Sequence, residues 1–325
     1  MRFLLCPLLL LSLAAGPLPA AERSPAITGA FHCGPCQQEA KVPERFRLKD
    51  EEVPFRLRQI PGVSPRYEVS TLTFPSPVKT ISAINNTVQC EYYSPKIAGK
   101  RPAVIVLHVL GGDLELSRMF CHALARQEIA ALFLVMPWYG PRRDPALPNR
   151  IVSGSPRETI AGMSQAVLDV RRATNWLASR PEVDTNRLGL MGISFGGITG
   201  ALAMAAEPRL TSGCLYLAGG DVGRIVWDSP EFDHLRPGLI RAGYTQERLA
   251  AELKPIDPTA YAAELRGRRV LMLNGRHDDI IPPACSLALR RAFGPGEIVW
   301  YAGDHYTATW GVLDVIHRSQ QFFKP

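Results

Sequence analysis

Short apolar runs alternate with helical patterns along most of the chain. Within each run the apolar residues are consecutive, as is typical of strands covered on both faces. Six runs are therefore predicted to be buried strands: residues 103–107, 130–136, 187–193, 214–218, 270–273 and 297–301. Upstream, residues 67–74 and 87–93 alternate apolar with polar positions, which predicts a pair of antiparallel strands.

The segments between these runs have helical periodicity. From residue 160 to residue 177, apolar side chains recur at spacings of three and four and form one stripe. Further helices are expected at 197–206, 285–293 and 307–322. Strands that alternate with helices in this way predict an α/β fold with a doubly wound, mostly parallel sheet.

Two segments depart from this alternation. Residues 221–268 separate two core strands by about 48 residues, far more than an ordinary connecting loop. Because 246–253 and 258–265 look helical, we expect a small cap inserted over the carboxyl edge of the sheet. Residues 22–65 are rich in Pro, Arg and Glu, and are expected to form an N-terminal extension that wraps the domain or stays partly mobile. The main α/β domain, including this insertion, would then span 66–325.

The first 21 residues have the pattern of a signal peptide. Arg2 precedes an apolar run over 3–15, followed by a Gly-Pro break and the small residues Ala20 and Ala21. The run is too short to span a bilayer comfortably, although an uncleaved anchor remains an alternative. The pattern predicts an exported protein, secreted or periplasmic, with no stable membrane insertion after cleavage.

Composition narrows the function only slightly. The chain has 325 residues, a 46% hydrophobic fraction and a formal net charge of +7. It has no run of Lys and Arg interleaved with aromatic residues, so nucleic-acid binding is not expected. Length and composition leave the oligomeric state open.

The most informative motif is Gly192-Ile193-Ser194-Phe195-Gly196, which lies between a predicted buried strand and a predicted helix. A sharp turn at this position presents the serine hydroxyl above the sheet, and it needs flanking residues without bulk. The positive end of the following helix lies beneath the serine. The backbone N–H of Phe195 then points toward a developing oxyanion.

A serine nucleophile needs a base, and the base needs an orienting carboxylate. Two later strand ends supply candidates in the required order. Gly275, Asp278 and Pro282 follow one strand, and Gly303 and His305 follow the next. Carboxyl ends of parallel strands share one edge of the sheet, so these groups can converge on the serine.

With these motifs, residues 67–322 resemble the α/β-hydrolase superfamily, particularly its dienelactone-hydrolase-like and acetyl-esterase-like branches. Those families carry Gly-x-x-Asp-x-x-x-Pro for the acid and Gly-x-His for the base. The resemblance implies a catalytic triad of Ser194, Asp278 and His305. The acid could instead be Asp221 or Asp279, and the base could be His108 or His277. Asp304 is expected to hydrogen-bond the loop that carries His305.

Two further site features follow the first predicted core strands. Relatives usually have His-Gly-x-Gly where this chain has His108-Val109-Leu110-Gly-Gly, so alignment places the second oxyanion donor on the N–H of Leu110. A mere Gly-rich strand exit is the alternative. Trp138 and Tyr139 could line a substrate pocket, or could belong to a packed loop.

These residues predict an esterase that acts on a small-molecule ester without a metal or organic cofactor. The first alternative is a serine peptidase or amidase of the same fold. A second is an exported redox or metal-binding protein that uses Cys33 and Cys36, although their Pro-rich surroundings favour a local disulfide or structural clip. A third is a non-catalytic binding protein, which the intact triad disfavours.

Overall fold

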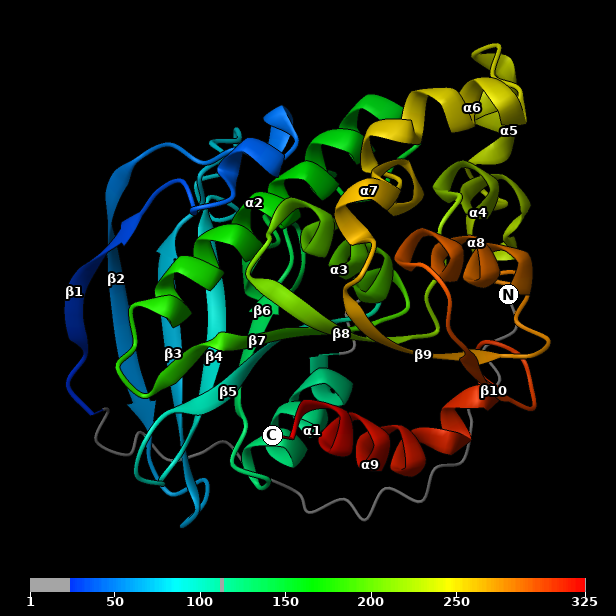
Figure 1. Ribbon diagram of the computed structural model, residues 1–325. Helices are drawn as coiled ribbons and strands as arrows, with labels where there is room; N and C mark the ends of the chain where they lie inside the picture. The colour runs from blue at the N-terminus through cyan, green and yellow to red at the C-terminus, as the bar shows by residue number, and fades with distance from the viewer. Residues whose placement is uncertain (1–23, 112–113, 325) are drawn as a thin grey trace.

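The computed structural model describes residues 24–111 and 114–324, and these residues build one ten-stranded sheet (Figure 1). The strand order is β1-β2-β3-β4-β6-β5-β7-β8-β9-β10. The strands are β1 (Ile27–Cys33), β2 (Glu51–Ile60), β3 (Tyr67–Pro75), β4 (Thr87–Pro95), β5 (Arg101–Leu107), β6 (Ala130–Val135), β7 (Val183–Ile193), β8 (Leu210–Tyr216), β9 (Arg269–Gly275) and β10 (Ile298–Tyr301). The first four strands and the β4–β6 pair are antiparallel, and all other neighbours are parallel. The predicted doubly wound, mostly parallel sheet is confirmed.

Helices cover both faces of the sheet. In Figure 1, α2, α3, α7 and α8 lie on one side and α1 and α9 on the other. The helices are α1 (Leu114–Ala125), α2 (Pro156–Ala178), α3 (Phe195–Ala206), α4 (Val222–Asp228), α5 (Arg236–Arg241), α6 (Gln246–Leu253), α7 (Ala262–Leu265), α8 (Pro283–Phe293) and α9 (Val312–Phe323).

The central strands are apolar because both of their faces are buried. Every residue of β5 and β6 is buried. Since successive strand residues point to opposite faces, Ile105 packs into one apolar cluster, whereas Val104 and Val106 pack into the other. The two-sided apolar runs in the sequence reflect this arrangement.

The N-terminal segment differs from the expected wrapping or mobile extension. Strand β1 pairs with β2 and β2 pairs with β3, so residues 27–60 extend the same sheet. Phe46 is fully buried, and the guanidinium of Arg171 on α2 lies 2.6 Å from the carboxylate of Glu39. The segment is therefore an integral part of the domain. Its pattern is weak because only Phe31 and Cys33 of β1 are buried.

The predicted insertion contains α4 to α7, and α6 has the bounds expected from the sequence. Helices α4 and α6 are in close contact, since a Cβ at Gly223 would lie 2.4 Å from the Cα of Ala250. None of the described helices is long and apolar enough to cross a membrane. The predicted signal peptide, residues 1–21, lies outside the described residues.

Candidate active site

Ser194 lies at the turn between β7 and α3. Its backbone has φ 53° and ψ −118°, an uncommon conformation for a residue with a side chain. The N–H of Ser194 donates a hydrogen bond of 2.7 Å to the carbonyl of Tyr216 on the neighbouring strand. A Cβ at Gly192 would lie 2.2 Å from the carbonyl oxygen of Gly196, so the turn requires glycine there.

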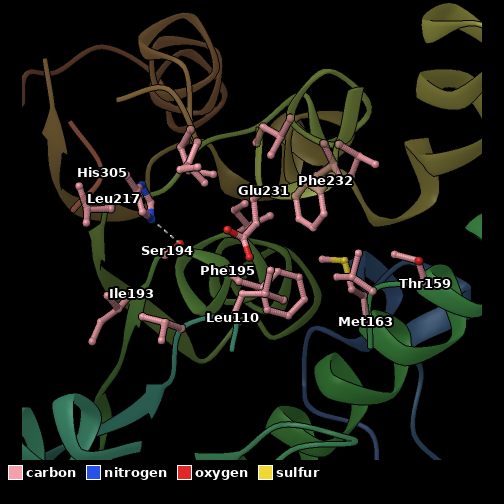
Figure 2. Close-up of a pocket in the computed structure, with 18 of the residues that line it drawn as sticks. Leu110, Thr159, Met163, Ile193, Ser194, Phe195, Leu217, Glu231, Phe232 and His305 are labelled. Atoms are coloured by element: carbon pink, nitrogen blue, oxygen red, sulfur yellow. Dashed lines mark hydrogen bonds between the residues drawn. The ribbon is translucent and has the colours of Figure 1, made fainter. Parts of the chain in front are cut away.

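Three side chains from separate strand ends meet at this turn. The Oγ of Ser194 is 2.9 Å from Nε2 of His305 (Figure 2), and Nδ1 of His305 is 2.7 Å from Oδ2 of Asp278. All three residues are at most 8% exposed. The second carboxylate oxygen of Asp278 accepts hydrogen bonds from the N–H groups of Ile280 and Ile281, at 3.0 and 2.7 Å.

These partners fix the hydrogen-bond directions. Because the carboxylate of Asp278 accepts only, Nδ1 of His305 carries the proton, and its Nε2 accepts from the hydroxyl of Ser194. This is the arrangement in which a serine can lose its proton to imidazole.

The other aspartates near the site have other partners or positions. Asp304 accepts from the N–H groups of Tyr306 and Thr307 and so orders the loop that carries His305. Asp221 caps the start of α4 by accepting from the N–H of Arg224. The remaining alternatives, His277 and Asp279, flank Asp278 on the loop between β9 and α8, and both side chains are exposed.

His108 has a structural position. It is fully buried, its Nδ1 contacts the carbonyl of Val109 at 2.8 Å, and its Nε2 accepts from the N–H of Met136 at 3.0 Å. Burial lowers the pKa of His108 to about 4. The neutral imidazole thus ties the end of β5 to the end of β6, just before Leu110.

The two candidate oxyanion donors come to the same cavity as the serine. Phe195 begins α3, where backbone N–H groups point out of the helix end. Leu110 follows β5, and both residues line the cavity that contains Ser194 and His305 (Figure 2). The chain turns at Gly111 with φ 87°, a conformation that favours glycine.

The expectation that Trp138 and Tyr139 line the pocket is wrong. Trp138 is 8% exposed, and its N–H donates to Asn85. The ring of Tyr139 packs 4.8 Å from the ring of His108, centroid to centroid. Neither residue lines the cavity beside Ser194. The loop uses its aromatic side chains for packing, which is the alternative left open by the sequence.

The cavity has a volume of about 300 Å³ and a mainly apolar wall. Figure 2 shows Thr159 and Met163 of α2 on the side away from His305. Sequence reasoning missed these two residues and the wall that the insertion contributes, which consists of Val222, Ile225, Val226, Glu231 and Phe232. The one available signal in the sequence was the apolar stripe of α2. An apolar stripe must be buried against other parts of the protein, and its residue Met163 lines the cavity.

Cys33 and Cys36 do not form the expected local disulfide, since both thiols are free. Cys33 is buried, and burial raises the pKa of both thiols. Among the described residues, no group of three or more His, Cys, Asp or Glu side chains is placed to hold a metal ion.

Comparison with known proteins gives one family match and two curated relatives. Residues 164–296 match the Prolyl oligopeptidase family. Two uncharacterized proteins of Mycobacterium tuberculosis, from strains CDC 1551 / Oshkosh and ATCC 25618 / H37Rv, are each 27% identical over 173 residues. The match covers 53% of this chain but only 40% of the length of each relative.

Solved structures of esterases share the fold. Acetyl xylan esterase 1 from Thermoanaerobacterium sp. JW/SL YS485 is 20% identical with a TM-score of 0.67, and the match covers 83% of this chain and 86% of that one. Acetyl xylan esterase from Paenibacillus sp. R4 is 18% identical with a TM-score of 0.62, over 81% and 88% of the two chains. A cold-adapted esterase from an Arctic intertidal metagenomic library is 17% identical, with a TM-score of 0.53 over 81% and 97%.

The chain therefore has the α/β-hydrolase fold, as the sequence motifs imply. The match of residues 164–296 to the Prolyl oligopeptidase family supports the class of serine hydrolases within that fold.

Proposed function

We propose that this protein is an exported serine esterase that cleaves a small-molecule carboxylic ester. The observation that carries the proposal is the line of hydrogen bonds from Ser194 through His305 to Asp278, at 2.9 and 2.7 Å. Ser194 and His305 line a cavity of about 300 Å³, in which an acyl group can reach the serine oxygen.

The reaction uses groups of the chain alone. Ser194 attacks the ester carbonyl while Nε2 of His305 takes its proton, and Asp278 stabilises the imidazolium that forms. His305 then gives the proton to the leaving alcohol, and an acyl-enzyme remains on Ser194. Water, deprotonated by the same imidazole, attacks the acyl carbonyl. The bond to the oxygen of Ser194 then breaks, His305 returns the proton to that oxygen, and the acid leaves.

The N–H groups of Phe195 and Leu110 stabilise the oxyanion of each tetrahedral intermediate. Removing one such donor typically costs about 3 kcal/mol of transition-state stabilisation. The lone pair of Nε2 is available for this chemistry because Nδ1 is held by the buried carboxylate of Asp278.

Labelling with a fluorophosphonate, followed by peptide mapping, tests the nucleophile. We expect label on Ser194 alone and none in a Ser194→Ala variant, whose turnover of p-nitrophenyl esters should fall by several orders of magnitude. Label on another residue, or a variant that keeps most of its activity, would refute the proposal.

Amide hydrolysis is the second candidate, because residues 164–296 match the Prolyl oligopeptidase family. The two functions are separated by comparing kcat/KM for short p-nitrophenyl esters with that for aminoacyl p-nitroanilides. Redox chemistry at Cys33 and Cys36 is disfavoured, because a raised thiol pKa leaves little reactive thiolate. Unchanged ester hydrolysis in a Cys33→Ser variant would end that alternative.

Export is proposed on the sequence pattern of residues 1–21. Its test is N-terminal sequencing of the protein from extracellular or periplasmic fractions of a bacterial host. A mature terminus close to residue 22 supports export, whereas an intact Met1 on cytosolic protein contradicts it.

A further inference from the structure

One wall residue of the active-site cavity differs in kind from the others. Glu231 is the acidic side chain among the described residues that line the cavity, and the apolar Phe232 follows it in the chain. In Figure 2 its carboxylate extends into the pocket on the side of Ser194 and Phe195. A carboxylate at this position faces whatever substrate occupies the cavity.

The carboxylate has no cationic side chain within ion-pair distance in the described parts of the chain. Its side-chain partner is the hydroxyl of Tyr306, which donates a long hydrogen bond of 3.4 Å. Burial and the nearby charge of Glu231 raise the pKa of Tyr306, so that hydroxyl stays protonated at neutral pH. Glu231 is exposed, so water as well as a bound substrate can reach its carboxylate.

Aromatic rings lie at the same part of the cavity. The ring of Tyr306 packs edge-on against the imidazole of His305, at 5.8 Å between centroids, and Phe232 follows Glu231 directly in the chain. Aromatic faces and a carboxylate together attract quaternary and primary ammonium groups, whereas a neutral alkyl group of the same shape gains only the apolar contact.

We infer that Glu231 is a specificity-determining residue that selects esters bearing a cationic ammonium group close to the scissile bond. This inference rests on the proposed esterase function. An ammonium group next to Glu231 lies on the same side of the cavity as Tyr306 and His305, while the apolar remainder of the substrate fills the wall toward Met163. The same carboxylate disfavours substrates with an anionic group at that position.

The test compares two esters of equal shape. Butyrylcholine carries a quaternary ammonium, and 3,3-dimethylbutyl butyrate replaces its nitrogen by carbon. We expect the wild-type protein to prefer the cationic ester by about twofold to fivefold in kcat/KM, the range expected for one exposed charge pair that water screens. Glu231→Gln keeps the shape of the side chain and should remove most of that preference. The preference of the wild-type protein should also fall as the salt concentration rises.

Asp233→Asn is the matched control, because it changes the net charge equally from an exposed position outside the cavity wall. It should leave the preference as it is. An equal preference in wild type and Glu231→Gln would overturn the inference, as would an equal loss in Asp233→Asn. If wild type hydrolyses both esters without preference, only the inference fails. If it hydrolyses neither and takes no fluorophosphonate label, the proposed function itself fails.

Discussion

At the scale of single residues, the serine turn depends on the lack of a side chain at Gly192. A methyl group there would lie 2.2 Å from the carbonyl oxygen of Gly196, and this oxygen belongs to the backbone of the same turn. We expect Gly192→Ala to lower the free energy of unfolding by about 3 kcal/mol or more, as overpacking of a rigid site does. Urea denaturation followed by circular dichroism measures this. Gly238→Ala, on α5 with open space around its Cβ, should cost nothing and could stabilise the helix by up to about 1 kcal/mol.

The buried imidazole of His108 predicts an acid-sensitive fold. Its pKa is about 4 in the folded protein, below the ordinary value of 6.5, so the unfolded chain binds a proton more readily. The stability due to neutral His108 is therefore complete above pH 6.5 and is lost as the pH falls toward 4. The size of the loss is about 3 kcal/mol. Protonation would also turn Nε2 from an acceptor into a donor facing the N–H of Met136.

Unfolding free energies of wild type and His108→Gln, measured from pH 7 to pH 4, test this prediction. The two profiles should converge as the pH falls, because the variant lacks the titrating group. Parallel profiles would mean that another group controls acid sensitivity.

The sequence was enough to predict that three candidate catalytic residues lie together, but not to predict the rest of the cavity wall. Ser194, Asp278 and His305 each follow a strand end in a short motif, and a parallel sheet brings such ends together. Glu231 has no such signal, because it lies in an insertion whose path over the sheet depends on tertiary packing. The sequence alone does not place Tyr139, because an aromatic ring suits a binding site and a packed core equally well.

At the scale of elements, a buried ion pair joins α2 to the loop after β6. Arg142 and Asp169 are both fully buried, with Nη2 2.8 Å from the carboxylate, and Arg142 also donates to the carbonyl of Asn85. Burial raises the pKa of Asp169 despite its cationic neighbour. An Arg142→Met variant leaves the carboxylate buried without that partner, so we expect a loss of about 3–5 kcal/mol in unfolding free energy.

Two other variants complete this test. The double variant Arg142→Met/Asp169→Leu should recover part of the loss, since no lone charge stays buried. Arg187→Met, which removes a partly exposed pair with Asp184, should cost less than about 1 kcal/mol. Equal losses for the two single arginine variants would contradict the role of burial.

Elements were predictable where both faces of a strand are buried. The run at 103–107 is apolar throughout and became the core of β5, and the stripe at 160–177 became most of α2. Strand β1 escaped prediction because most of its residues are exposed and its pairing with β2 depends on backbone hydrogen bonds, which any sequence can make. Helix α1 was also missed, although it buries Phe120 and Leu124 against the sheet.

At the scale of the whole molecule, the N-terminal segment, the sheet and the insertion share one core. Phe46 comes from the segment that the sequence marked as an extension, and its ring lies 6.0 Å from that of Tyr261 in the insertion. Both residues contribute to the apolar cluster on the α2 face of the sheet. Because this packing joins parts that are far apart along the chain, we expect the protein to unfold as a single cooperative unit.

The variant Phe46→Ala tests whether the N-terminal segment unfolds together with the rest of the protein. Removing a fully buried ring typically costs about 3–5 kcal/mol, and here the loss should lower the midpoint of the one main transition. Calorimetry together with unfolding followed by tryptophan fluorescence and circular dichroism gives the measurement. Ile81→Ala, at a side chain that is 83% exposed, should stay within about 0.5 kcal/mol of wild type.

If residues 22–65 were a separate extension, Phe46→Ala would instead split off a minor early transition and leave the main one in place. Activity would then survive beyond that first transition, whereas a shared core requires activity and structure to be lost together.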